Sequence, residues 1–302
     1  MANEILPAGI GDLHAQEVLA AEYLMLLAEQ GNPFTHPAFM FATGAPGSNV
    51  VRVRHIGLGN GYNLLASATP GSEVANTALT DGSTDVTVAR YSKRYFRDDL
   101  TKFMAAGLLN AELFAQDAAV AVTQTLLNLV ANVTDGFAAT VGTTTVDLLW
   151  SDIVDAKTTL AIAKAAGRML ALLHPRQWGD LDTDSLSLGG VPQQGAGLQG
   201  AVSAGLEQYK GNFFGIDFFT SSQVPTANTG ADRAGAVFTR GAVAIADVEY
   251  DVESDPNIVH LGRAIFERDR QGTYGATSYL THAMLGTAMG IDAAGVSVIS
   301  DA

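Results

Sequence analysis

The first half of the chain alternates between helical and extended patterns of apolar residues. Residues 10–31 repeat apolar side chains at helical spacing, with Asp12 as a candidate N-cap. Residues 50–56 and 85–91 alternate apolar and polar positions, as a strand with one solvent face does. The segment from Tyr95 to about Val130 carries the longest helical pattern and predicts a rod more than about 50 Å long. A second helix is expected over residues 147–164.

Residues 32–48 carry three prolines and two glycines, which favour an extended arm over a helix. This arm contains Phe34, Phe39 and Phe41, and these aromatic side chains need a surface to pack against.

The second half of the chain is mainly extended. RMLALL (168–173) predicts a buried strand that His174-Pro175 ends, and a short helix is expected over 176–181. Further on, the expected elements are a helix at 197–209, strands at Phe213–Thr220 and Gly235–Ala246, an acidic turn at 249–255, and strands at 258–270, 278–285 and 296–300.

The two strands at 50–56 and 85–91 are separated by a loop rich in glycine, serine and threonine, from Gly57 to Thr84. A two-stranded arm of this kind cannot bury a core of its own. We therefore expect the arm to lie on a neighbouring molecule, which is the first indication of assembly.

Composition narrows the function classes. The 302-residue chain is 47% hydrophobic, so it can bury a substantial core, and it has no cysteine, which excludes disulfides and thiolate chemistry. The net charge of −14 argues against ordinary nucleic-acid binding, although it suits the inner wall of a container that must not adhere to its contents. No apolar run reaches the roughly 18 residues of a membrane span, so no membrane association is expected.

Motifs that could carry chemistry are weak. Gly57-Leu58-Gly59-Asn60-Gly61 lacks the spacing and the following helix of a dinucleotide loop. Asp180, Asp182 and Asp184 alternate as calcium ligands can, but Ser185 stands where such a loop needs glycine, so a solvated turn is expected. The acidic series from Asp247 to Asp255 is open to an ion-binding role, a subunit contact or a plain solvated face. No zinc-helix histidine pair or G-x-S-x-G elbow occurs, so we expect no enzyme, cofactor or metal site.

In their order along the chain, these segments closely resemble the major capsid (coat) proteins of tailed double-stranded-DNA bacteriophages. That fold is shared with encapsulins and with the floor of herpesvirus capsids. The resemblance covers almost the whole chain. It rests most on RMLALLHPRQWGDL (168–181), GIDFFTSSQVP (215–225) and AGAVFTRGAVAIADVEYDVESDP (234–256).

The resemblance implies an α+β tailed-phage coat-protein fold. Its expected parts are an N-terminal arm (1–48), an extended β-hairpin loop (49–93), the spine helix of a peripheral domain (94–131), an axial domain (132–246), peripheral-domain return strands (247–285) and a C-terminal return to the axial domain (286–302).

The function implied is that of a major capsid protein, which self-assembles as pentamers and hexamers into an icosahedral shell around packaged DNA. Some relatives link a loop lysine to a neighbour's asparagine. The extended loop here holds only Lys93, at its base, so no such link is expected. Only about 48 residues precede the hairpin, so a separate scaffolding protein is expected, together with a portal. Decoration proteins are a further candidate partner. The location would be the virion capsid, assembled in the host cytoplasm.

Intersubunit contacts are expected from arm aromatics and from basic side chains that pair with acidic surfaces of a neighbour. A solvated face is the alternative for the charged members. The candidates are Phe34, Phe39, Phe41, Arg52, Arg54, Arg90, Arg94, Arg97, Asp247, Glu249 and Asp251. Two other readings remain: an encapsulin-like nanocompartment that loads a cargo protein, and a soluble enzyme of unknown chemistry.

Overall fold

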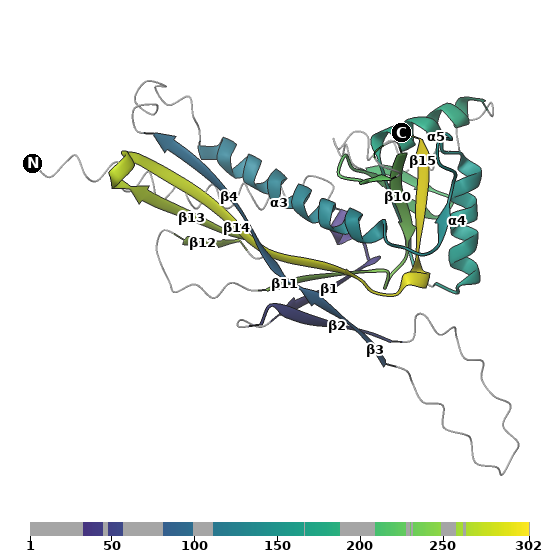
Figure 1. The fold of residues 1–302 in the computed structure, drawn as a ribbon, viewed down its shortest axis with the longest axis horizontal. Coiled ribbons are helices and arrows are strands. Elements are labelled where there is room, and N and C mark those ends of the chain that lie inside the picture. The colour runs from purple at the N-terminus through teal and green to yellow at the C-terminus, as the bar shows by residue number, and fades with distance from the viewer. Residues whose placement is uncertain are drawn as a thin grey trace, which may run out of the picture.

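The computed structural model describes residues 33–44, 48–56, 81–98, 111–165, 167–187, 209–227, 230, 232–248, 258–261 and 264–301. They form an elongated sheet with a long helix beside it, a two-stranded arm, and a compact sheet with two helices at one end (Figure 1). The expectations for a helix at 10–31, a helix at 197–209 and an acidic turn at 249–255 lie outside the described residues.

The elongated sheet has the strand order β1-β11-β14-β13-β12, and β4 pairs with β14 as well. The long strand β14 organises it, since it pairs with β13 and β4 along most of its length and with β11 near its C-terminal end. The strands are β1 (Phe39–Gly44), β4 (Ala89–Asp98), β11 (Val243–Val248), β12 (Ile258–Leu261), β13 (Ala264–Gln271, joined to β14 through η3, Gly272–Tyr274) and β14 (Ala276–Met289).

Helix α3 (Ala111–Thr134) and the arm pack on opposite faces of this sheet. Alternate residues of a strand point to opposite faces. Val243 and Ile245 of β11 accordingly share a core with Leu126 and Leu127 of the helix. The intervening Ala244, Ala246 and Val248 pack instead with the arm.

The described helix begins at Ala111, whereas helical spacing predicted a start near Tyr95. Residues 95–98 belong to β4, so this part of the prediction, and of the 94–131 helical segment, is wrong. Backbone pairing of β4 with β14 continues to Asp98, opposite Ala276, and overrides the local helical pattern. Lys93 Nζ on β4 then reaches Asp117 on the helix, at 2.5 Å.

The arm consists of β2 (Val50–Ile56) and β3 (Asp81–Thr87), paired antiparallel. Its apolar face, formed by Val51, Val53 and Val86 with the adjoining Val88, is buried against the elongated sheet of the same chain. The expectation that the arm needs a neighbouring molecule to cover it is therefore wrong for this described part.

The compact sheet has the order β5-β15-β10-β6-β8-β7, with β9 paired to β10. Its strands are β5 (Thr140–Val141), β6 (Met169–Leu173), β7 (Tyr209–Phe213), β8 (Ile216–Thr220), β9 (Thr226–Ala227), β10 (Asp232–Phe238) and β15 (Gly295–Asp301). The helices α4 (Trp150–Ile162) and α5 (Pro175–Ser187) lie at this end of the molecule (Figure 1). Ile153 and Leu160 of α4 and Leu181 of α5 are buried against Phe218 and Val298 of this sheet.

Each of the two long runs expected in 213–246 is in fact interrupted by a turn. Residues 213–220 contain the turn Phe214-Gly215, where φ is +54° and +81°, as a two-residue type I′ hairpin requires. Residues 235–246 contain the crossing Thr239–Ala242, after which the chain enters the elongated sheet as β11. The expected domain boundary at Ala246 thus falls inside β11, because the chain leaves the compact sheet about four residues earlier.

Two chain crossings between the sheets lie side by side. Thr239–Ala242 leads out of the compact sheet, and Gly290–Ala294, which includes η4 (Asp292–Ala294), leads back into it. Their backbones are hydrogen-bonded to each other: Gly290 N–H donates to Ala242 O and Ile291 N–H donates to Gly241 O, both at 2.8 Å. A Cβ on Gly290 would come within 2.3 Å of Gly241 O, so only glycine allows this approach. The two sheets are therefore joined here by a tight double crossing, in addition to the passage from α3 to β5.

Candidate functional site

The three aromatic residues of the N-terminal segment 32–48 pack mostly within their own chain. Phe34, just before β1 in η1 (Pro33–Thr35), is 4% exposed, and Phe39 is 6% exposed. The ring of Phe39 lies 5.4 Å from Phe34 and 5.4 Å from Phe238 of the compact sheet. Phe41 is 40% exposed. The surface that these rings need is thus largely supplied by the same subunit, and Phe41 presents the most area to another molecule.

The arginines of the arm lie on its solvent face. Arg52 forms a two-point pair with Asp85 on the facing strand, with Nε to Oδ1 at 2.7 Å and Nη2 to Oδ2 at 3.0 Å. This pairing lowers the pKa of Asp85. Arg54 is exposed two residues further along the same strand. Arg52 is therefore already engaged within the chain, and a role for either arginine at a neighbour stays a prediction.

The remaining arginine candidates follow β4. Arg90 and Arg94 lie on the sheet face that carries Met284 and Leu280, their register partners on β14. The guanidinium of Arg94 stands 5.8 Å from the centre of the Phe96 ring. Arg97 is placed by its backbone opposite Thr277. Arg90 and Arg94 thus share one face of β4, while Arg97, an odd number of residues away, belongs to the other face, and a contact role for the three stays a prediction.

Asp247 lies in β11, between Thr43 of β1 and Leu285 of β14. Glu249 and Asp251 lie outside the described residues. The structure thus brings none of the arginine candidates opposite Asp247 in its strand registers.

One set of exposed apolar side chains was not predicted from the sequence. It is distributed along α4, from the residue before the helix to its last residue, and at the tip of the β7–β8 hairpin, and we call it the α4 surface. Its members are Leu149, Val154, Ile162 and Phe214, between 41% and 77% exposed. Ile153, Ala156 and Leu160 of α4 form the buried stripe, while Val154 and Ile162 fall outside it. Exposed apolar side chains gain free energy when another molecule covers them, so the α4 surface is a candidate contact region.

Phe214 is held in a backbone conformation that aromatic residues seldom adopt. Its φ of +54° occupies the first position of a type I′ turn, where Asn, Asp or Gly is preferred. The ring stands 5.6 Å from that of Trp150 and remains 48% exposed. Lys157 on α4 donates to its carbonyl oxygen at 2.6 Å. Strain of this kind tends to be kept where a side chain has a function, so Phe214 is the strongest single candidate.

A second exposed cluster, the tip surface, lies at the far end of the elongated sheet. Phe96 of β4 is 53% exposed, and Tyr274, in the turn between β13 and β14, is 71% exposed. Their rings meet edge to face at 6.3 Å. Two features of the sequence could have revealed the α4 surface: a second set of apolar positions on α4, and a phenylalanine before glycine where a hairpin turns.

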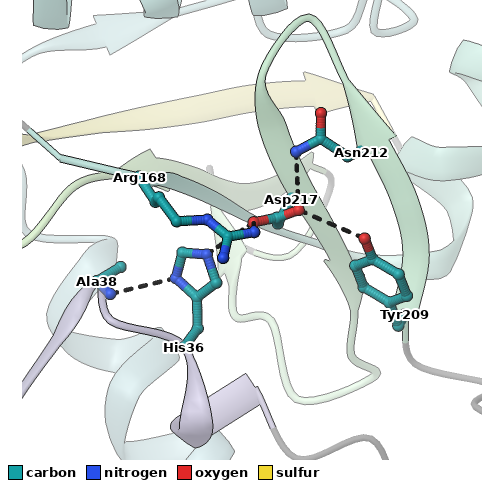
Figure 2. A network of polar contacts seen from close by, with 6 residues as sticks. All are labelled: His36, Ala38, Arg168, Tyr209, Asn212 and Asp217. Carbon is teal, nitrogen blue, oxygen red and sulfur yellow. Dashed lines mark hydrogen bonds and ion pairs between the residues drawn. The ribbon is translucent and has the colours of Figure 1, made fainter. Parts of the chain in front are cut away.

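Figure 2 shows a buried polar network around Asp217 of β8. One carboxylate oxygen, Oδ2, lies 2.8 Å from both His36 Nε2 and Arg168 Nη2. The other, Oδ1, accepts from Asn212 at 2.8 Å and from the Tyr209 hydroxyl at 3.4 Å. Sequence reasoning missed this network because its members lie up to 181 residues apart.

Two effects oppose each other at Asp217. Burial alone would raise the pKa of its carboxyl, but the hydrogen bonds from Asn212 and His36 and the charge of Arg168 outweigh burial and lower it. Burial lowers the pKa of His36, more than its contacts with Asp217 raise it. The network therefore holds an ionised carboxylate beside a neutral imidazole. His36 Nδ1 accepts from the Ala38 backbone N–H, so the ring nitrogen that would serve a nucleophile is occupied.

The three aspartates considered as calcium ligands lie in helix α5, not in a turn. Asp184 accepts from the backbone N–H of Trp150 at 3.1 Å, and Asp180 lies 3.5 Å from that of Leu148. Asp184 and Asp180 thus accept from backbone N–H groups at the N-terminal end of α4, where the first N–H groups have no partner within the helix. In the part of the chain that the structure describes, no group of three or more His, Asp or Glu side chains could hold a metal ion. None of the helices described is long and apolar enough to cross a membrane.

Comparison with known proteins places this fold. No protein-family model matches the chain, and no curated protein matches its sequence. Solved structures do match along nearly the whole length. The head structure of Helicobacter pylori bacteriophage KHP40 is 10% identical, with a TM-score of 0.59 and 87% of each chain covered. The capsid of Ralstonia phage GP4 is 11% identical, with a TM-score of 0.55 and coverage of 89% of this chain and 90% of that one.

The holo-SrpI encapsulin complex of Synechococcus elongatus PCC 7942 matches to a similar degree. It is 10% identical, with a TM-score of 0.53, and covers 87% of this chain and 84% of that one. The chain therefore has the mixed α/β coat-protein fold that tailed-phage capsids share with encapsulins, as its sequence resemblance predicted.

Proposed function

We propose that this chain is the major capsid protein of a tailed bacteriophage and builds the shell that encloses the packaged double-stranded DNA. The observation that carries the proposal is the match of almost the whole chain, on both sides of the comparison, to subunits of closed shells. A fold used in this way has no need of a catalytic centre. The work of the protein is then to hold neighbouring copies together.

The surfaces of the subunit support this role. The α4 surface lies at the compact end and the tip surface at the far end of the elongated sheet, so each subunit offers apolar area at both ends (Figure 1). The compact unit would be the axial domain, grouped in fives and sixes around the shell's symmetry axes. The elongated sheet and α3 would be the peripheral domain. Phe41, Arg54, Arg90 and Arg94 remain candidates for contacts along the sides.

The net charge of −14 suits a wall that faces DNA without binding it. Assembly would take place in the host cytoplasm, with a separate scaffolding protein and a portal, and decoration proteins could bind outside.

An encapsulin-like compartment is the second candidate, because the SrpI encapsulin structure matches with similar coverage. The two functions share the subunit fold and differ in the contents of the shell: a genome in one case, a cargo protein in the other.

The test is to purify the full chain and examine it by sedimentation velocity and negative-stain electron microscopy. We expect closed shells, or rings of five and six subunits. A stable monomer of 31.5 kDa at all concentrations would contradict both shell functions. Particles recovered from producing cells and treated with nuclease should retain protected DNA if the capsid proposal holds. Particles with a stoichiometric second protein and no DNA would instead establish the compartment.

A further inference from the structure

The segment before β1 lies where the two sheets of the subunit meet. Phe34, Ala38 and Phe39 are buried in a core that also contains Phe219 and Phe238 of the compact sheet. His36, between them, turns toward the compact sheet and meets Asp217 of β8 (Figure 2). His36, in the segment before β1, is thus hydrogen-bonded to a buried carboxylate 181 residues away.

The contacts of His36 fix one tautomer of its ring. Nδ1 lies 3.2 Å from the backbone nitrogen of Ala38, which can only donate, so Nδ1 carries no proton. Nε2 therefore bears the ring's proton and donates it to Asp217 Oδ2 at 2.8 Å. A second proton on Nδ1 would set two donors against each other and break the bond to Ala38.

A second proton would also upset the charge balance of the network. The carboxylate of Asp217 faces the imidazole from β8, and Arg168, just before β6, already contacts the same oxygen. Tyr209 of β7 reaches the carboxylate as a neutral hydroxyl. With a neutral ring, one negative and one positive charge cancel. A protonated ring would leave a net positive charge at a histidine whose side chain is only 7% exposed.

We propose that His36 is a proton-sensitive latch, which holds residues 33–44 against the compact sheet while its ring is neutral and releases them when the ring gains a second proton. The latch would control how firmly residues 33–44 are attached to the rest of the subunit. The proposal concerns the single chain and stands whether or not the chain builds a shell.

The direction with pH follows from the buried ring. Because the pKa of His36 lies below its ordinary value of about 6.5, the latch is fully formed above that pH. Its stabilisation is lost as the pH falls through the lowered pKa. Asp217, whose pKa is lowered too, stays ionised over this interval. Opening as the pH falls below about 6.5 is therefore a property of the histidine.

The test is hydrogen exchange of the full chain between about pH 7.5 and about pH 5, corrected for the intrinsic pH dependence of exchange. The reporters are the β1 amides, and β10 amides at the centre of the compact sheet serve as the internal reference. Between about pH 6.5 and the lowered pKa of the ring, we expect β1 protection relative to β10 to fall by up to about tenfold per pH unit, and to level off below that pKa. The matched variant is His36→Gln, which keeps a donor for Asp217 and cannot gain a charge. Its β1 protection should follow the reference at every pH.

An NMR titration of the His36 ring in the wild-type chain gives a readout that needs no variant. The ring should titrate below about 6.5, at the pH where the loss of β1 protection levels off. Three outcomes would overturn the latch: β1 protection that stays constant down to about pH 5, a His36→Gln variant that loses protection with the wild-type profile, or a ring that titrates at or above 6.5. The state of assembly of the chain enters none of these readouts.

Discussion

Gln177, in the first turn of α5, is a single buried side chain that joins three parts of the compact unit. It is 0% exposed. Its carbonyl oxygen accepts from the backbone N–H of His174, and its amide nitrogen donates to Arg233 O, Val298 O and the Ser300 hydroxyl at 3.0–3.2 Å. The side chain therefore fixes α5 to β10 and β15 by hydrogen bonds that water cannot replace.

Replacing Gln177 by leucine should destabilise the subunit by about 3 kcal/mol. The apolar side chain conserves volume but leaves the His174 N–H and the Ser300 hydroxyl without this partner in a dry site. Urea denaturation followed by fluorescence measures the change. The control is Gln223→Leu, because Gln223 is partly exposed and accepts one bond from Asn128 at 3.3 Å. That variant should stay within about 0.5 kcal/mol of wild type. Equal effects of the two variants would contradict the special role of Gln177.

At the scale of elements, the arm is held by its own subunit through one apolar face. Val51, Val53 and Val86 are at most 6% exposed, and the alternating Arg52 and Asp85 face solvent. A two-stranded hairpin is marginal by itself, so this packing is what should keep it ordered.

We therefore expect the β2 and β3 amides to be protected from hydrogen exchange even in unassembled subunits. The variant Val86→Ala removes two methyl groups from a fully buried position and should weaken arm attachment by about 2 kcal/mol. Protection of the arm amides would then drop about thirtyfold, while that of β10 would not change. Thr87→Ala, on the exposed face of the same strand, is the control. Arm amides that exchange freely in unassembled wild-type subunits would show that a neighbour is needed after all.

Most strands could be predicted from the sequence because their patterns are local. Residues 50–56 alternate strictly, and the apolar run before His174 is ended by Pro175, so both strands were predicted within a residue of their ends. The start of the long helix was predicted wrongly, because Tyr95–Asp98 pair as a strand with β14, some 180 residues later in the chain. The turn at Phe214 was missed because it uses a phenylalanine where the rule for type I′ turns expects Asn or Gly.

The candidate site was predicted less well than the fold. Sequence patterns indicate which residues are charged or aromatic, but not which of them already have partners in the folded chain. Arg52 is paired with Asp85, and Phe39 is buried against Phe238. Val154 and Ile162, which are exposed, read in the sequence as ordinary helix residues. The His36–Asp217 contact joins two segments whose approach depends on both sheets.

At the scale of the whole molecule, the proposed shell needs contacts that are dispensable to the single subunit, and Phe214 offers a clean test of one. The variant Phe214→Asn places a favoured residue in the type I′ turn and removes the exposed ring. Its effect on subunit stability should remain below about 1 kcal/mol, because better turn preference opposes the lost contact with Trp150. If the α4 surface joins neighbouring copies, the subunit concentration needed for assembly should rise about tenfold, the effect of losing about 1.4 kcal/mol at a buried contact.

Light scattering during assembly measures this concentration, and Phe214→Tyr is the control that keeps the ring. Assembly of Phe214→Asn at the wild-type concentration would exclude the α4 surface. An equal defect in Phe214→Tyr, which keeps both the ring and the turn preference, would show that loss of the apolar ring is not the cause.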